Sequence, residues 1–401
     1  MLKVLTPTAA WEVILARFGA YRTAEEPVPT EAALHRVLSE DVTAREYVPA
    51  FDRSTVDGFA VCASDTFGCS ENLPALLALD GEVRMGESAG APLAHGCCRA
   101  IPTGGELPSG ADAAVMLEYT ERYGGGDIGV TKPVAPGANL IHKGDDAFPG
   151  KVILRAGRRL IPADLGALAA LGIGEVYVAK KPTVGVISTG DELVPVGETP
   201  GAGQVRDVNS ALLEAEISAA GGEARLYGVI PDDERAIMAA LWRSTEDCDI
   251  TLLSGGSSVG EKDAAAKLIS SVGELLFHGV AMKPGKPAIV GDAGGRPVFG
   301  LPGHPAAAHF SAELFVRPLI VSMLGGAFFR KTASARLAEA LSSNNGREEY
   351  VAVALEGGLA RPIRAKSGLI TALAGSDGYI VVPRDCEGLS EGAEVSVFLY
   401  E

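Results

Sequence analysis

Two lysines three positions apart, Lys283 and Lys286, lie in the segment MKPGKP. The prolines in this segment restrict the backbone, so the two ammonium groups are partly positioned before a ligand arrives. An opposite charge about 4 Å from one of them would contribute ~4 kcal/mol at an effective dielectric of 20, roughly four times the value in water. The pair indicates an anion-binding site, and a solvated loop with two surface lysines is the alternative.

Three polar or glycine-rich turns follow apolar runs and could complete such a site. They are STGDEL (188–193), SGGSSVGEKD (254–263) and LPGHP (301–305). If the apolar runs are parallel strands, these turns lie outside the carboxyl ends of a sheet, where ligands gather in open α/β folds. Ser254, Gly255 and Gly256 then offer hydrogen-bond donors, and Pro305 suits the first turn of a following helix.

Acidic residues occur in the same group of loops, namely Glu192, Asp232 and Asp263. Their carboxylate oxygens could hold a divalent cation that bridges to an anionic substrate. Each carboxylate could instead cap a helix or lie in an exposed turn.

The overall charge excludes some partners. Lys and Arg number 35 and Asp and Glu 51 in 401 residues, so the net charge is 35 − 51 = −16. A charge of that sign repels nucleic acids and anionic membranes, and we expect neither as a partner. No apolar stretch approaches the ~20 residues of a membrane helix, and the first residues lack a secretory pattern. We therefore expect a soluble, cytoplasmic protein.

The cysteines and several short motifs carry no predicted chemistry. The six cysteines include no C-x-x-C pair and no Cys/His cluster at zinc spacing, which predicts reduced thiols. His95, His278 and His309 are interpreted as structural or surface residues. GGGDIG (124–129) is interpreted as a turn, and Ser258 in GSSVG lacks the surroundings of a serine hydrolase nucleophile.

The spacing of the apolar residues predicts the helices and strands that position these candidate residues. It indicates helices over 9–19 and 31–40 and a β-rich module of hairpins over 42–146. From 182 to 324, strands alternate with helical runs, which indicates βαβ units and a mainly parallel sheet. From Thr332 onward the chain returns to short alternating runs, typical of a small β module.

Six segments together resemble one known family. They are PAFDRSTVDGFAV (49–61), IPTGGELPSGADAAVM (101–116), STGDEL, SGGSSVGEKD, MKPGKP and GLPGHPAAA. They occur in the order seen in the MoeA family, which comprises the molybdopterin molybdenumtransferases and includes the E domain of gephyrin. The chain resembles this family from about residue 6 to its end.

The resemblance implies a fold of the α/β class with added β modules. It implies a multidomain chain with a central parallel-sheet molybdopterin-binding domain, a β-rich insert domain and a small C-terminal β-barrel domain. The implied limits are 1–24 for an N-terminal helix packing with the α/β domain, 25–45 and 147–179 for a linking domain, 46–146 for the β-rich domain, 180–327 for the α/β domain and 328–401 for the C-terminal β domain.

The resemblance also implies an activity and partners. Members of the family insert molybdate into adenylylated molybdopterin with release of AMP, assisted by Mg²⁺. The implied partners are these two substrates, a second copy of the chain in a homodimer, and other proteins of molybdenum cofactor biosynthesis.

Matching positions imply the site residues. The catalytic set is Asp57, Thr103, Glu192, Asp232 and Asp263, with Glu192 and Asp263 as metal ligands and with Asp57 and Thr103 reaching the cleft of the other subunit. The substrate-binding set is Ser254, Gly255, Gly256, Lys283, Lys286, Pro302, Pro305, Arg347 and Ser367.

Two departures from the family pattern leave alternatives open. His304 stands where the family usually has Asn, and the run 140–143 (LIHK) stands where it tends to have several arginines. A preference for tungstate and a non-catalytic scaffold or binding protein are the alternatives that these departures leave open. SGGSSVGEKD also resembles a related adenylyltransferase domain of the same pathway, so an adenylyltransferase activity is a further alternative.

Overall fold

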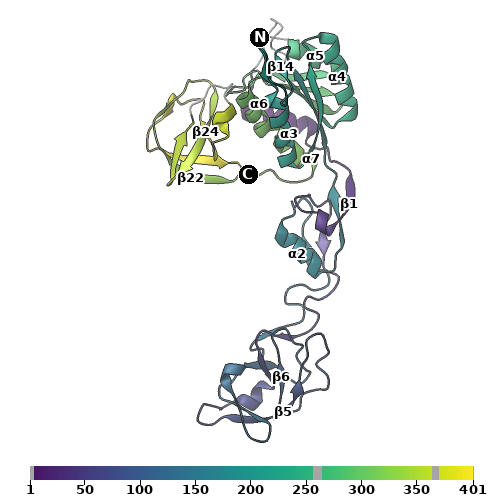
Figure 1. The fold of residues 1–401 in the computed structure, drawn as a ribbon, viewed down its shortest axis with the longest axis vertical. Helices are drawn as coiled ribbons and strands as arrows, with labels where there is room; N and C mark the ends of the chain where they lie inside the picture. Colours follow the sequence, from purple (N-terminus) through teal and green to yellow (C-terminus); the bar gives the residue numbers. More distant parts are fainter. Residues whose placement is uncertain (1–3, 256–263, 364–369, 401) are drawn as a thin grey trace.

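The structure is a computed structural model that describes residues 4–255, 264–363 and 370–400. The molecule is elongated (Figure 1), with an α/β domain and a C-terminal barrel side by side at one end and a β domain at the other. A slender linking part with β1 (Glu25–Pro29), β12 (Glu175–Ala179) and α2 (Pro162–Ala170) separates the two ends. We call the α/β domain and the barrel together the head. The multidomain α/β fold with added β modules is confirmed. No helix in the described ranges is long and apolar enough to cross a membrane.

The α/β domain is built on a sheet that is parallel at its centre. Its described strands, in spatial order, are β16 (Glu223–Ile230), β13 (Thr183–Thr189), β17 (Ile250–Ser254), β21 (Arg296–Leu301), β20 (Ile289–Ala293) and β18 (Glu274–His278). The first four pair in parallel, whereas β21, β20 and β18 pair antiparallel. The prediction of a mainly parallel sheet is confirmed, with an antiparallel edge added.

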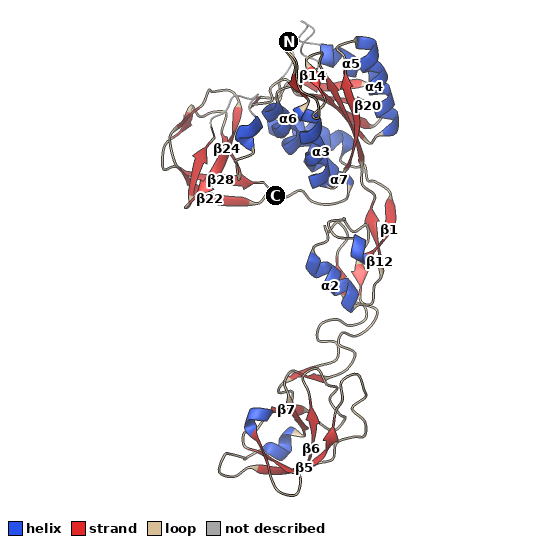
Figure 2. Ribbon diagram, in the orientation of Figure 1, coloured by secondary structure: helices blue, strands red, loops and turns tan. Residues whose placement is uncertain are grey.

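Helices cover both faces of this sheet (Figure 2). One face is covered by α4 (Glu234–Asp247) and α5 (Ala264–Val272). The other face is covered by α1 (Pro7–Phe18), α3 (Val208–Ala220), α6 (Pro305–Ser311) and α7 (Arg317–Met323). A π-helical turn, η4 (Ala312–Val316), joins α6 to α7. Asp207 and Asp233 cap α3 and α4 by accepting hydrogen bonds from N–H groups of the first turn. Pro305 opens α6, as predicted.

The C-terminal domain is a small barrel. Its strands are β22 (Thr332–Leu337), β24 (Glu348–Glu356), β25 (Leu359–Pro362), β26 (Gly378–Val382) and β28 (Glu394–Leu399). The sheet closes because β24 pairs with β26 as well as with β25, which confirms the predicted barrel. A short strand of the α/β domain, β19 (Met282–Lys283), pairs in parallel with β24 and joins the two domains. The smaller elements are β23 (Leu341–Ser342), β27 (Gly388–Leu389) and α8 (Ile370–Leu373).

The β domain is a sheet wrapped around its own apolar core. Its strands, in spatial order, are β7 (Ala113–Met116), β4 (Gly58–Val61), β6 (Cys97–Ile101), β5 (Ala75–Glu82), β9 (Asp127–Val130) and β8 (Thr120–Arg122), with the short 3₁₀ helices η2 (Ala63–Thr66) and η3 (Leu117–Tyr119). Phe59, Val61, Val115 and Val130 are buried in it. The first three glycines of GGGDIG, residues 124–126, lie in the turn between β8 and β9, as predicted, whereas residues 127–129 already belong to β9.

The chain passes through the linking part twice. The described pairs there are β1 (Glu25–Pro29) with β12 (Glu175–Ala179) and β2 (Val42–Thr43) with β11 (Val152–Leu154), and η1 (Thr30–Ala32) and α2 (Pro162–Ala170) complete it. Two short pairs lie elsewhere: β3 (Arg53–Ser54) with β10 (Leu140–Ile141) in the β domain, and β14 (Leu193–Val194) with β15 (Val205–Arg206) in the α/β domain. The residue limits assigned to the domains stay predictions.

The helix predicted over 31–40 is wrong. Only η1 at its start is helical; His35 has a positive φ of 64°, and Val37 and Leu38 form strand-like bridges. The N–H of His35 donates to the carbonyl of Leu160 and that of Leu38 to Arg158, so the backbone bonds run to a distant segment. The helical spacing of apolar residues instead reflects burial of Ala33, Val37 and Leu38 between neighbouring segments.

Candidate functional site

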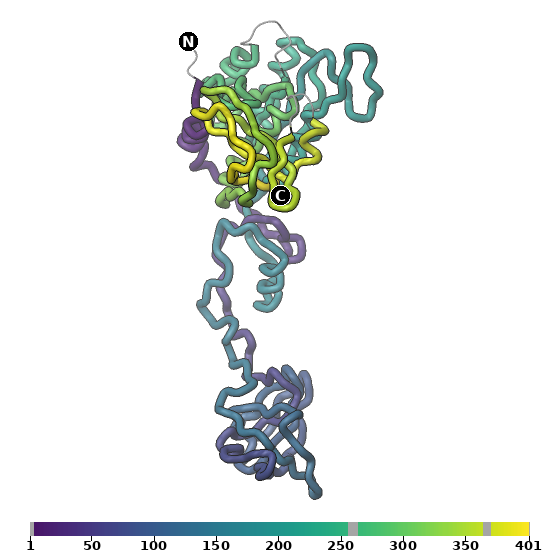
Figure 3. The backbone as a smooth tube through the Cα atoms, turned by 90° about the vertical axis from the view of Figure 1, so that its left-hand side faces the viewer, coloured from purple at the N-terminus to yellow at the C-terminus, as the bar shows by residue number. Residues whose placement is uncertain are grey.

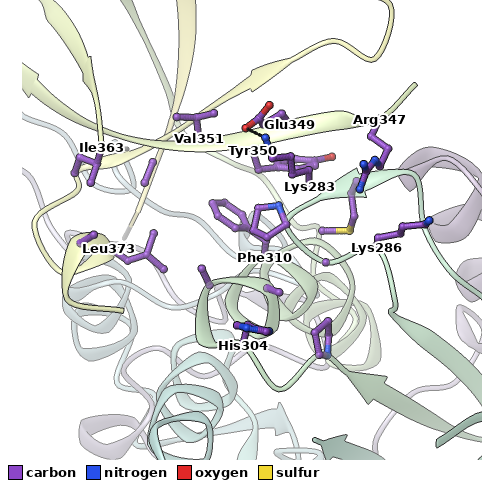
Figure 4. A pocket seen from close by; sticks show the side chains of 18 of the residues that line it. Lys283, Lys286, His304, Phe310, Arg347, Glu349, Tyr350, Val351, Ile363 and Leu373 are labelled. Atoms are coloured by element: carbon purple, nitrogen blue, oxygen red, sulfur yellow. Dashed lines mark ion pairs between the residues drawn. The ribbon is translucent and has the colours of Figure 1, made fainter. Parts of the chain in front are cut away.

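A pocket of about 1060 Å³ lies where the α/β domain meets the barrel (Figure 4). The α/β domain contributes the loop after β19 and the start of α6, and the barrel contributes β23, β24 and α8. Four predicted substrate-binding residues line it: Lys283, Lys286, Pro302 and Arg347. The structure thus gathers residues that lie up to 64 positions apart in the chain (347 − 283).

The positive groups of the pocket are held unequally. The Lys283 ammonium lies 2.7 Å from a carboxylate oxygen of Glu349, and Ser343 donates a hydrogen bond of 2.6 Å to the other oxygen. Lys283 remains about half exposed, so its charge still reaches the pocket. Lys286 is exposed and reaches the pocket from the other side of the loop. An anion in the pocket would meet one oriented lysine and one exposed lysine.

Much of the remaining lining is apolar and aromatic. It includes Phe310, Tyr350, Leu341, Val351, Ile363 and Leu373. Burial raises the pKa of Tyr350 far above its ordinary value, and the neighbouring Glu348, which accepts a hydrogen bond of 2.8 Å from the phenol, adds to the shift. Tyr350 therefore stays neutral. A planar ligand with a charged end fits a pocket of this kind, because one wall is apolar and another is cationic.

His304 and Pro305 occupy the start of α6. His304 is the N-cap residue, its side chain makes no capping hydrogen bond, and it faces the pocket. Pro305 is the first helical residue and is not among the lining residues. The imidazole that replaces the family's usual Asn therefore lies where it can touch a ligand.

The carboxyl ends of the parallel strands are tied together by a buried amide. Asn209 on α3 donates to the Ser254 hydroxyl at 2.8 Å and to the Gly303 carbonyl at 2.9 Å. Gly255 follows at φ 108°, and a side chain there would collide with the carbonyl of Thr189. Ser254 and Gly255 thus lie at the predicted edge of the sheet, whereas Gly256 lies outside the described residues.

Two of the predicted acidic residues follow neighbouring strands. Glu192 is exposed in the turn after β13, and Asp232 follows β16. The N–H of Asp232 donates to Asp191 at 3.1 Å, which links the two loops. The adjacent Asp233 caps α4 through a 2.8 Å bond from Ala236, so its carboxylate serves the helix. Asp263 and Ser367 lie outside the described residues.

Asp57 and Thr103 come together far from the pocket. The Thr103 N–H donates to the Asp57 carboxylate at 2.7 Å, and both residues are exposed. They follow or precede paired strands of the β domain, which lies at the opposite end of the molecule from the head (Figures 1 and 3). Within one chain the structure therefore does not join these two residues to the pocket.

Sequence reasoning missed Glu349 and Asn209. The alternation of YVAVALE predicts a strand, but it does not say that the acidic residue just before it faces a lysine of another domain. Asn209 opens a helix next to a capping aspartate, where Asn is common for local reasons. A buried amide bonded to two strand ends requires the three-dimensional fold to be recognised.

Comparisons with known proteins cover nearly the whole chain. Three family profiles match: the MoeA N-terminal region (domains I and II) at 5–172, the probable molybdopterin binding domain at 185–321 and the MoeA C-terminal region (domain IV) at 334–400. The chain is 34% identical to the molybdopterin molybdenumtransferase of Bacillus subtilis, covering 100% of this chain and 95% of that protein.

One further relative and one solved structure agree with these matches. A putative molybdopterin biosynthesis protein of Methanocaldococcus jannaschii is 34% identical, with 92% of this chain and 90% of that protein covered. The crystal structure of the molybdopterin biosynthesis moeA protein from Pyrococcus horikoshii OT3 superposes with a TM-score of 0.89 at 36% identity, covering 99% of this chain and 100% of that one.

Proposed function

Because this chain belongs to the MoeA family, we propose that it inserts molybdate into adenylylated molybdopterin and releases AMP. Its relatives at 31–34% identity are named molybdopterin molybdenumtransferases, and on this ground the chain is an enzyme of that kind in molybdenum cofactor biosynthesis. The adenylylated substrate, the oxyanion and the steps below are our proposal. Its main support is the pocket that places Lys283, Lys286 and Arg347 beside an aromatic wall.

The cationic side of the pocket suits the oxyanion and the phosphates. Lysine and arginine neutralise oxyanions, and arginine adds directional hydrogen bonds. Glu349 and Ser343 hold Lys283 in place before binding, so its orientation costs less when the anion arrives. The aromatic side, with Phe310 and Tyr350, offers a surface for a flat ring system.

The acidic loops suit a hard cation. Glu192 and Asp232 follow adjacent parallel strands and offer carboxylate oxygens, the ligand type that Mg²⁺ prefers. Mg²⁺ commonly uses one or two carboxylates together with substrate phosphates and water. We assign Glu192 and Asp263 as its ligands. When bound, Mg²⁺ would withdraw charge from the phosphoanhydride that is cleaved.

We also propose that the chain acts as a homodimer. Asp57 and Thr103 are exposed at the end of the molecule away from the pocket. If they contribute to catalysis, the pocket that they complete belongs to another copy. A closed two-fold dimer would then hold two equivalent shared sites.

The experiment is AMP release from adenylylated molybdopterin with Mg²⁺, with molybdate, with tungstate, or with neither. We expect release that depends on molybdate and a loss of about 10²-fold in Lys283→Ala, since a charge-assisted contact to the anion is removed. Lys132→Ala, in the β domain, is the matched control. Release with tungstate alone would contradict the assigned oxyanion. Consumption of ATP with free molybdopterin would indicate an adenylyltransferase instead.

A further inference from the structure

Three side chains with metal-binding atoms converge at one end of the β domain. Cys62, Asp65 and His95 each offer one ligand atom, and these atoms all lie within 4.8 Å of one another. The sequence analysis predicted no such cluster, because His95 lies 30 residues beyond Asp65 and matches no zinc spacing. Among the described residues, no other group of three or more metal-ligating side chains is this close.

Two paired strands bring the cluster together. Cys62 directly follows β4 and begins η2, which carries Asp65, while His95 lies in the turn before β6. Strands β4 and β6 are antiparallel with Val61 opposite Cys98, so the end of one strand meets the start of the other. The ladder of the sheet therefore brings the segments that carry the thiol and the imidazole side by side.

The hydrogen bonds orient the imidazole. His95 Nδ1 lies 2.9 Å from Asp65 Oδ1, and Asp65 Oδ2 accepts the N–H of Gly96 at 2.8 Å. With Asp65 accepting from Nδ1, the lone pair of the neutral ring is on Nε2. This Nε2 lies 4.0 Å from Cys62 Sγ. A carboxylate behind a histidine whose other nitrogen faces a ligand atom is the usual outer support of a metal-bound histidine.

We propose that Cys62 Sγ and His95 Nε2 bind a thiophilic divalent cation of the Zn²⁺ type, with Asp65 orienting the imidazole. Typical bond lengths are about 2.3 Å for Zn–S and about 2.0–2.1 Å for Zn–N, so one ion can bridge atoms 4.0 Å apart at a wide angle. The thiol proton leaves to solvent on binding, and the thiolate takes its place as ligand.

The exposure of the cluster determines the kind of site. The His95 side chain is 76% exposed, whereas that of Asp65 is 16% exposed. The open side leaves coordination positions for water or for a ligand atom from another molecule, unlike a closed structural zinc site. A sulfur and a nitrogen ligand favour Zn²⁺ over Mg²⁺, which prefers oxygen.

This site is separate from the proposed catalytic residues. Asp57 precedes β4 and Thr103 follows β6, so they lie at the other end of the same two strands. Five residues of extended chain from Asp57 to Cys62 span about 16 Å. The inference therefore does not rest on the proposed function.

The test is titration of the purified full chain with Co²⁺, a spectroscopic substitute for Zn²⁺. We expect one Co²⁺ per chain with a thiolate-to-cobalt charge-transfer band, displaced by Zn²⁺. Cys62→Ser should abolish the band, and Asp65→Asn should weaken the affinity about 10- to 100-fold. Cobalt bound at the acidic loops would show no such band, because those ligands are oxygen atoms.

Matched controls separate ligation from general damage. Cys97→Ser removes another partly buried thiol, and His142→Gln removes another histidine beside an aspartate, Asp52, at 3.6 Å. Both variants should keep the band, while His95→Gln should lose it. Circular dichroism confirms that each variant is folded. Absence of the band from the wild-type chain at equimolar Co²⁺, or its persistence in Cys62→Ser, would overturn the proposal.

Discussion

The candidate functional residues of the head lie at a junction between two domains, whereas those of the β domain lie on a single unit with its own core. In the head, two domains are joined by the pairing of β19 with β24 and by aromatic contacts among Phe310, Tyr350 and Tyr379, with ring centroids 5.4–5.9 Å apart. The β domain has its own apolar core and is connected to the head through the linking part alone in both views (Figures 1 and 3).

A buried ionic cluster strengthens the junction within the head. Glu313 contacts Arg317 at 2.6 Å and Arg330 at 3.0 Å, and His309 lies between Glu216 and the Tyr400 hydroxyl. Burial raises the pKa of Tyr400 far above its ordinary value, so it remains a neutral hydrogen-bonding group. The pocket is thus built across a firm junction, whereas Asp57 and Thr103 are presented on a separate unit.

The largest effect is expected when the two regions are disabled in different chains. Asp57→Ala and Lys283→Ala should each lower AMP release, by up to about 10³-fold for a catalytic carboxylate. In the proposed dimer, subunit exchange between the two variants makes half of the dimers mixed, and each mixed dimer has one intact shared site. We expect about a quarter of the wild-type activity to return.

The control for this experiment is a mixture of Lys283→Ala with Arg347→Ala, which disables the same pocket in both chains. It should recover nothing, because both changes affect the head. Recovery in the control, or no recovery in the Asp57 mixture despite verified exchange, would contradict a shared site.

The second prediction concerns the independence of the β domain. Phe59 is 2% exposed, and Phe59→Ala should destabilise the β domain by about 3–4 kcal/mol through lost burial and a cavity. Both tryptophans, Trp11 and Trp242, lie on helices of the head, so tryptophan fluorescence follows the head alone. The urea midpoint seen by fluorescence should stay unchanged, while hydrogen exchange of β4 and β6 accelerates. A shifted fluorescence midpoint would show that the two regions unfold together.

The third prediction concerns a substitution that destabilises the head and leaves the β domain unchanged. Glu313→Ala leaves two buried or half-buried arginines without their main counterion and should destabilise the head by about 3 kcal/mol. The fluorescence midpoint should fall, and hydrogen exchange in the β domain should not change. Glu394→Ala, which removes an exposed carboxylate bonded to Ser334 in the barrel, is the control.

The smallest effect concerns Glu349. Its charge offsets that of Lys283 in a half-exposed pair, an interaction of about 0.7 kcal/mol. Glu349→Gln should therefore lower the KM for the anionic substrate about threefold. Glu348→Gln is the matched control, because this neighbour contacts Tyr350 rather than the lysine. An increase of KM would show that orientation of Lys283 matters more than its net charge.

The sequence predicted what depends on local pattern and missed what depends on distant pairing. The strands 183–189, 250–254 and 296–301 were predictable, because buried parallel strands are short apolar runs followed by glycine turns. The segment 31–40 was not, because its backbone donors bond to residues 158–160.

The candidate site shows the same division between features predicted from local pattern and features that depend on distant pairing. MKPGKP was recognised from its charge and its restricted backbone and Arg347 from the family resemblance, and the pocket brings them together. The pairing of Lys283 with Glu349, the buried bonds of Asn209 and the convergence of Cys62 with His95 each join segments 30 or more residues apart. No local spacing rule contains that information.

The antiparallel bridge between Val48 and Ala147 also has a consequence for synthesis of the chain on the ribosome. The β domain enters and leaves at this one point, so all its strands are made before β12 and most of the head. The β domain can therefore fold before the helices that cover α1 have been synthesised. At about 5–20 residues per second, roughly 15–60 s separate α1 from α7. During that interval η4 and α7, the helical segments that contact α1, are not yet made, so the apolar face of α1, with Ile14 and Phe18, is incompletely covered on the growing chain.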